Sequence, residues 1–182
     1  AVDCLFFSPR LGASYKLLPD LTVFASAAMS SRTPTDAAIY DANNPSAFPS
    51  LEISDLSVAS SGDTTYIFGD PTAKAEKVLD LELGAQLRKN NYEFGANLFW
   101  MEFYDEILPE GGVDANSGLR KSINADRSIH AGIELSASAE VHQSLRLSAN
   151  AAFNYNRLRD FIVNLDGYDV SFADKTIPGF AD

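Results

Sequence analysis

The side chains able to do acid–base or nucleophilic chemistry are few in this sequence. It has two histidines, His130 and His142, and one cysteine, Cys4. An imidazole titrates near neutrality and can serve as a general base, but His142 falls in a predicted tight turn and His130 on the polar side of a predicted strand. The Ser and Asp residues form no nucleophile elbow, no His–Asp spacing and no phosphate-binding glycine pattern. The sequence therefore predicts a protein that is not an enzyme.

Metal and cofactor sites are not predicted either. Cys4 has no second cysteine for a disulfide or a zinc site. The segment 31–74 is acidic, and its carboxylates could coordinate calcium, attract a cationic ligand or keep an exposed loop soluble, of which solubility is the default. These acidic residues are Asp36, Asp41, Glu52, Asp55, Asp63 and Asp70.

The overall charge excludes one class of partner. The 182 residues carry a formal net charge of −11, with 25 acids against 14 bases. Nucleic-acid backbones are bound by surplus Lys and Arg, so nucleic acid is not an expected partner. No run of apolar residues approaches the roughly 20 that a membrane-spanning helix needs, which excludes an α-helical membrane protein.

The elements that must position the polar side chains are strands with alternating apolar and polar residues. In the segment 79–88, Leu79, Leu81 and Leu83 alternate with Asp80, Glu82 and glycine, and a shift by one residue would move charges onto the apolar face. Six segments show this period of two. The predicted strands span residues 9–17, 21–30, 78–88, 92–104, 128–141 and 145–157.

One stretch leaves its interpretation open. From Phe99 to Tyr104 bulky aromatic residues occupy both faces of the strand. This pattern fits a bulge, an aromatic girdle at a membrane interface or contact with a plug inside a barrel.

The connections alternate between short and long. Turns of about three residues near Pro19, Asn90 and Gln143 separate paired strands, whereas long polar loops occupy 31–77, 106–127 and 157–176. Short turns at one end and long loops at the other are typical of outer-membrane barrels. The predicted fold class is all-β, an antiparallel up-and-down transmembrane β-barrel segment.

A barrel crossing a bilayer must close, because unpaired backbone groups in hydrocarbon cost several kcal/mol each. Six strands are fewer than the eight of the smallest barrels, and the chain starts without an export signal, so we expect it to be a fragment. One face should contact lipid and the other the lumen. The expected lipid-facing residues are Leu79, Leu81, Leu83, Ile133, Leu135 and Leu147, and the expected lumen residues are Glu82, Gln86, Glu134 and Asn150.

Several short motifs, in order along the chain, resemble the C-terminal barrel portion of TonB-dependent outer-membrane receptors. Each motif alone is weak, but their shared order and spacing support the resemblance. Three of them depart from the family pattern, at Ser31 in place of an aromatic residue, at Ala75 in place of proline and at Ala131 in place of arginine. The similar segments are Ser8 to Gly12, Leu21 to Ser26, Ser31 to Thr35, Ala75 to Lys77, Leu83 to Gly84, Phe99 to Ile107, His130 to Leu135 and Thr176 to Gly179.

The resemblance implies a partial barrel over residues 1–182, belonging to a 22-stranded barrel whose N-terminal plug and TonB-contacting box lie outside this chain. It implies localisation in the bacterial outer membrane and uptake of a scarce nutrient, with siderophore–iron the leading class, energised through TonB. The implied partners are outer-membrane lipid, TonB through the missing N-terminal region, and a small-molecule or metal-chelate ligand. No cofactor is implied.

Site residues follow from the motifs and from the aromatic content of the first long loop. The expected ligand-binding residues are Arg32, Tyr40, Phe48, Tyr66 and Phe68, and the expected plug or barrel-wall contacts are Arg32, Glu76 and Glu134. Alternatively, the charged side chains of the polar face have no specific partner and only keep the lumen wall hydrated.

Two other functions stay open at this point. A passive porin-like or structural outer-membrane barrel would share the strand pattern but lack a plug. A soluble ligand-binding β-domain would explain the acidic charge, but it would leave the paired long apolar faces unexplained.

Overall fold

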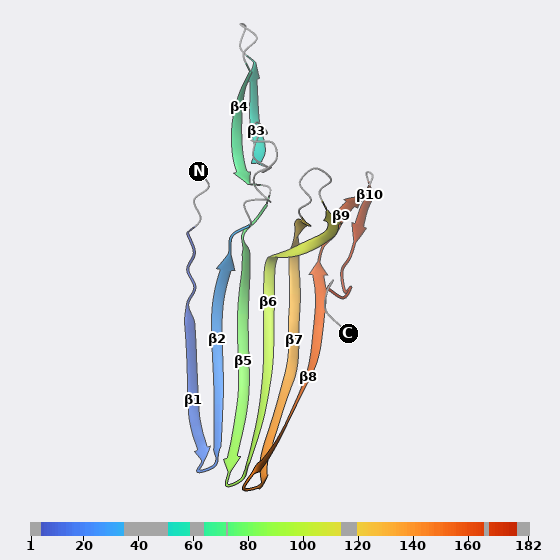
Figure 1. Ribbon diagram of the computed structural model, residues 1–182. Helices are drawn as coiled ribbons and strands as arrows, with labels where there is room; N and C mark the ends of the chain where they lie inside the picture. The colour runs from blue at the N-terminus through green and yellow to red at the C-terminus, as the bar shows by residue number, and fades with distance from the viewer. Residues whose placement is uncertain are drawn as a thin grey trace.

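The computed structural model describes residues 5–34, 51–58, 64–71, 73–113, 120–165 and 168–177. Its main element is one antiparallel sheet of six strands, arranged side by side in chain order as β1-β2-β5-β6-β7-β8 (Figure 1). These strands span Arg10–Leu18 (β1), Leu21–Arg32 (β2), Glu76–Lys89 (β5), Tyr92–Val113 (β6), Arg120–His142 (β7) and Leu145–Asp160 (β8).

The six predicted strands are confirmed, and so is their antiparallel, up-and-down order. The hairpin turns are shorter than predicted. Pro19-Asp20, Asn90-Asn91 and Gln143-Ser144 connect the strands with two residues each, because pairing continues to Leu18, Lys89 and His142. Asn90 has a positive φ of 46°, a backbone conformation that asparagine tolerates better than most residues.

The long loops contain strands that the period-two pattern did not predict. β6 and β7 continue past the predicted ends, and two separate hairpins form from Leu51–Val58 (β3) with Thr64–Pro71 (β4) and from Ile162–Leu165 (β9) with Tyr168–Ser171 (β10). In Figure 1 both hairpins lie at the loop end of the main sheet. None of the described residues forms a helix long and apolar enough to span a membrane.

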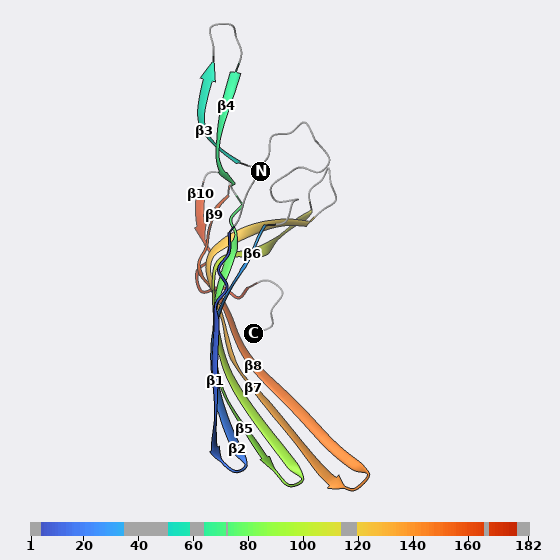
Figure 2. The same cartoon turned by 90° about the vertical axis from the view of Figure 1, so that its left-hand side faces the viewer.

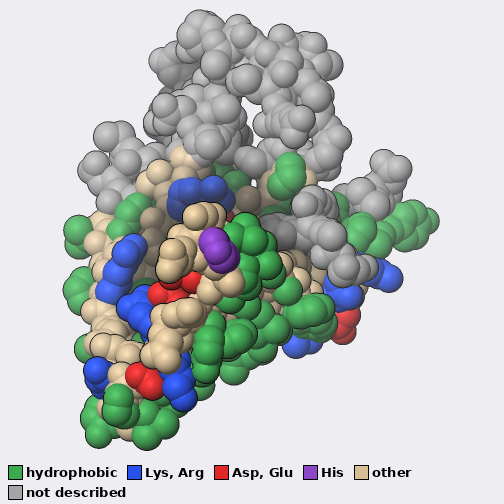
Figure 3. All heavy atoms as spheres, turned by 60° about the horizontal axis from the view of Figure 1, so that its bottom comes forward, with side chains coloured by type: hydrophobic (Ala, Val, Ile, Leu, Met, Phe, Trp, Pro, Cys, Tyr) green, Lys and Arg blue, Asp and Glu red, His purple; other side chains and the backbone are tan. Residues whose placement is uncertain are grey.

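The six-stranded sheet has an apolar face and a polar face, because side chains alternate and paired residues share a face. One row of the apolar face joins Ala25, Leu83, Leu98, Ile133 and Phe153 across five strands. Figure 3 shows a strip of hydrophobic side chains beside a strip where charged and other polar side chains gather. The register places the expected lipid-facing and lumen residues on opposite faces, as predicted.

Glycines on the polar face make room for aromatic rings. A Cβ added at Gly84 would lie 2.1 Å from the Phe24 ring, and one at Gly132 would lie 2.8 Å from the Phe99 ring. The pairing of β5 with β6 is regular through this region. Phe99 therefore lies on the polar face and Trp100 on the apolar face, and the aromatic run contains no bulge.

β6 bends where the aromatic run ends. Asp105 has a positive φ of 53°, and Figure 2 shows β6 curving away at the loop end. In an unbroken strand Glu106 would share the apolar face with Tyr104. Its carboxylate instead contacts Ser128 and His130 on the polar face, so the alternation reverses at Asp105.

A small hydrophobic core forms beyond the bend. It joins β6, β7, β8 and the segment after β10, so the loop end is packed as well as hydrogen-bonded. Its buried members are Leu108, Ala125, Leu158 and Ile177, with Phe161 and Phe172 against them.

Candidate functional site

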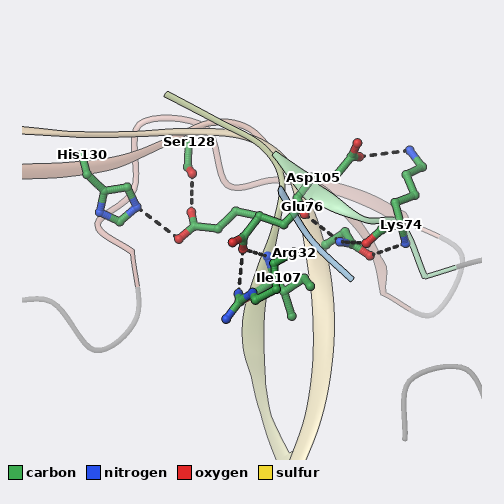
Figure 4. Close-up of polar contacts among 9 residues, drawn as sticks. Arg32, Lys74, Glu76, Asp105, Ile107, Ser128 and His130 are labelled. Atoms are coloured by element: carbon green, nitrogen blue, oxygen red, sulfur yellow. Dashed lines mark hydrogen bonds and ion pairs between the residues drawn. The ribbon is translucent and has the colours of Figure 1, made fainter. Parts of the chain in front are cut away.

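Arg32 and Glu76 form an ion pair at the base of the first long loop. They are register partners, Arg32 ending β2 and Glu76 beginning β5. The Arg32 Nη2 atom lies 2.7 Å from Glu76 Oε2, and the same oxygen accepts a 2.8 Å hydrogen bond from the Ile107 backbone N–H (Figure 4). Glu76 is buried, whereas Arg32 is largely exposed. This carboxylate therefore connects the loop base to the bent part of β6.

A second polar cluster lies next to the first on the polar face. The Ser128 hydroxyl donates to Glu106 Oε2, His130 Nε2 lies 3.1 Å from Glu106 Oε1, and His130 Nδ1 lies 2.9 Å from Asn156 Oδ1. The Phe103 ring packs edge-on against His130 with 5.0 Å between centroids. All four polar side chains are buried. Buried polar groups need such partners, so the cluster fixes β6, β7 and β8 to one another.

A third contact ties the end of the first long loop to the bend. The Asn124 amide accepts a 3.0 Å hydrogen bond from the Lys74 N–H and donates to the carbonyls of Lys74 (3.0 Å) and Asp105 (2.7 Å). The Lys74 ammonium lies 3.4 Å from Asp105 and 4.0 Å from Asp126. Together the three contacts make a loop-end network. The network consists of Arg32, Lys74, Glu76, Asp105, Glu106, Ile107, Asn124, Asp126, Ser128, His130 and Asn156.

Glu134 lies apart from the loop-end network, nearer the turns. It is in register with Asn97 on one side and Ala152 on the other. A hollow of about 150 Å³ on the polar face is lined by Asp80, Glu82, Asn97, Phe99, Met101 and Glu134. Within the described residues, one oxygen each of Asp80 and Asn97 is buried without a hydrogen-bond partner. This acidic hollow suits a cationic partner more than an anionic one.

The structure brings together only part of the predicted set. Arg32 and Glu76 are paired, and Glu134 is separate from them. Tyr40 and Phe48 lie outside the described residues, and Tyr66 and Phe68 belong to β4, for which the structure describes the backbone alone.

His130 was expected on the polar side of a strand without a specific partner, and Glu106, Ser128 and Asn156 were not predicted as site residues. Ser128, His130 and Asn156 share the polar parity of their strands, which was a usable signal. Glu106 has the opposite parity in β6, so only the backbone conformation of Asp105 reveals its partners.

The loop-end network consists of hydrogen bonds and ion pairs that connect the ends of the strands. Among the described residues no group of three His, Cys, Asp or Glu side chains is placed to hold a metal ion. What the site provides is a fixed base for the loops and an acidic wall beneath them.

The comparisons with known proteins agree with this geometry. The family model "TonB dependent receptor-like, beta-barrel" matches residues 5–181. A search of curated protein sequences gives no significant match.

Solved structures of similar fold include three transporters or receptors. The siderophore receptor PirA from Pseudomonas aeruginosa superposes with a TM-score of 0.58 and 23% identity, over 82% of this chain and 28% of its own. The FrpB iron transporter from Neisseria meningitidis gives 0.55 and 17%, over 93% and 21%. The copper transporter OprC gives 0.57 and 16%, over 83% and 20%.

The chain thus spans between a fifth and three tenths of those three proteins. At these identities the likeness establishes the fold, and the family model covers nearly the whole chain. On that match, the chain belongs to the TonB-dependent receptor-like β-barrel family.

Proposed function

We propose that this chain forms part of the wall of a bacterial outer-membrane receptor that imports a scarce nutrient, with a ferric siderophore as the leading substrate class, using energy relayed by TonB. The observation that carries the proposal is the six-stranded sheet of this family, with one apolar and one polar face. The plug, the TonB-contacting segment and the remaining strands would belong to the same receptor.

The apolar face supports a membrane location. Leu83 is 57% exposed and Phe153 63% exposed in the same row, which would be unfavourable in water and is favourable against lipid chains. From Tyr92 up to Glu102, where the charged rows begin, the strand rises about 33 Å, or about 25 Å along the membrane normal at a tilt of about 40°. This height matches the apolar band of outer-membrane barrels.

Positions along the polar face suggest separate roles for the predicted site residues. Arg32 and Glu76 lie at the loop base, where the ligand loops would be anchored, and we assign ligand contacts to Arg32, Tyr40, Phe48, Tyr66 and Phe68. Arg32, Glu76 and Glu134 are assigned to plug or barrel-wall contacts, and a cationic plug side chain would complement the acidic hollow that Glu134 lines.

Uptake by cells tests the function. Cells expressing the complete receptor should accumulate labelled ferric siderophore only when TonB is present, and the accumulation should fall to the level of receptor-deficient cells without TonB. Uptake of the true substrate that persists undiminished without TonB would instead indicate a passive porin-like channel.

A further inference from the structure

The apolar face changes character toward the loop end. The row Leu81, Trp100, Ala131 and Tyr155 is apolar and aromatic, and the next row contains Glu102 and Arg157. Ile129, between these two in register, is only 4% exposed, whereas Leu81 in the row before is 42% exposed. One row closer to the loop end, the surface of this face therefore changes from exposed apolar side chains to the long charged side chains of Glu102 and Arg157.

The following row presents two cations on either side of a tyrosine. Lys77 of β5 is in register with Tyr104 of β6, and Tyr104 is in register with Arg127 of β7. Neighbouring strands are about 4.8 Å apart, so the Lys77 and Arg127 backbones are about 10 Å apart. Both side chains are long enough to reach one group lying over the tyrosine ring.

Arg127 is held in place by its neighbours. Its guanidinium donates from Nε and Nη2 to Glu102 Oε1 and lies over the Tyr104 ring, with 5.9 Å from Cζ to the centroid. Asp160 is its register partner on β8. At this level the cations Lys77, Arg127 and Arg157 outnumber the carboxylates Glu102 and Asp160 on the outer wall.

Hydrogen-bond donors remain available in this row. Among the described residues, the structure gives no ion-pair or side-chain hydrogen-bond partner to the exposed Lys77 ammonium, to the Tyr104 hydroxyl or to Nη1 of Arg127. A lysine, a hydroxyl and a guanidinium edge are donors suited to a phosphate group.

We propose that Lys77, Tyr104 and Arg127 form a binding site for a phosphate-bearing lipid headgroup on the outer wall of the sheet. The inference rests on the proposed membrane location, because the row then lies about 5 Å beyond the apolar band, at headgroup level. A cation there would be costly in hydrocarbon but is stabilised by lipid phosphate. Trp100 and Tyr155, nearer the turns, would contact the upper part of the acyl chains.

Native mass spectrometry of the complete receptor in detergent tests the site. The probe is diphosphorylated lipid A, with its dephosphorylated form and inorganic phosphate as comparison ligands. We expect the dephosphorylated lipid to bind at least tenfold more weakly and millimolar inorganic phosphate not to displace the lipid. Equal binding of the two lipids, or displacement by inorganic phosphate, would overturn the proposal.

Substitutions locate the binding. Lys77→Gln removes no ion pair or side-chain hydrogen bond of the described residues and should weaken lipid A binding several-fold. Lys77→Gln combined with Arg127→Gln should weaken it at least tenfold. Lys89→Gln is the matched control, because Lys89 is also exposed and in register with a tyrosine, Tyr92, but at the turn end. Loss of binding in the control as well, or retention in the double variant, would refute the site.

Loss of folding, loss of transport and loss of lipid binding can be told apart. Each variant is first checked for the gel mobility of a folded barrel, and Lys77→Arg with Arg127→Lys should retain binding. A receptor that binds lipid A at this site but fails to transport contradicts the proposed uptake and leaves this inference standing. A receptor that stays in solution without detergent would contradict the membrane location, and with it this inference.

Discussion

Single residues on the polar face determine how closely side chains pack over the sheet. Gly84 allows the Phe24 ring to lie across its Cα, and the added Cβ of an alanine would meet three ring atoms within 2.9 Å. Gly12, on the same face, has only ordinary contacts at 3.7 Å or more. Both glycines lie between a leucine and an alanine in an alternating strand, yet only Gly84 makes room for an aromatic ring.

Gly84→Ala is therefore expected to destabilise the folded receptor by about 1–3 kcal/mol, because the Phe24 ring must move from its position. Gly12→Ala should change stability much less. Urea unfolding of the complete receptor in lipid vesicles measures both. Equal effects of the two substitutions would contradict the packing role of Gly84.

Glu106 is the second residue with a specific role. Its carboxylate holds Ser128 and His130 at the same time, and both partners are buried. Glu106→Ala should cost about 1–3 kcal/mol, since it leaves buried donors unsatisfied, and should increase cleavage of the loops in limited proteolysis. Glu140→Ala on β7, whose exposed side chain has no such contact in the described structure, is the control. Unchanged proteolysis of the Glu106 variant would show that the network does not support the loops.

At the scale of elements, β5 shows most clearly how one strand contributes side chains to both the apolar face and the polar face. Its residues are in register with both β2 and β6 from Lys77 to Leu87, so the face of each side chain is fixed on both sides. A one-residue slip would expose the charges of Asp80, Glu82 and Arg88 on the apolar face.

Leu83→Arg should impair barrel assembly far more than Gln86→Arg. A charge on the lipid face near the membrane midplane costs about 2–4 kcal/mol, whereas an arginine on the lumen face stays hydrated. The folded fraction in isolated outer membranes, measured by heat-dependent gel mobility, distinguishes the two variants. Equal tolerance of both substitutions would count against a membrane-facing apolar face.

At the scale of the whole molecule, the sheet has two open edges. Among the described residues, β1 and β8 each pair with one strand of the main sheet, and the end of β8 gains a further bridge from Arg157 to Thr176. Long open edges favour pairing with other chains. In the proposed receptor, closure of the barrel would therefore depend on strands other than these six.

The isolated chain, residues 1–182, is accordingly expected to associate through its edges when refolded in detergent. The complete receptor should give a monomeric, protease-resistant barrel under the same conditions. Analytical ultracentrifugation with detergent correction separates the two outcomes. A monomeric and protease-resistant species from the isolated chain would show that the six strands close or protect their own edges.

The sequence by itself determined the six strands, their order and the two faces. The reason is physical, since side chains alternate with a period of two, and charged or polar residues on one parity disfavour the neighbouring register. Short motifs singled out Arg32 and Glu76 as expected ligand, plug or barrel-wall residues; the structure pairs them at the loop base, and those roles stay predictions.

Only the tertiary structure decided the loop end. Glu106 contacts the polar face because Asp105 takes a positive φ, a conformation that asparagine and aspartate tolerate but that their presence does not impose. The pairing of Lys74 with Asn124 and the core around Leu108 and Ile177 join residues far apart in the chain. Such contacts depend on where three separate loops return to the sheet, and local periodicity contains no information about that.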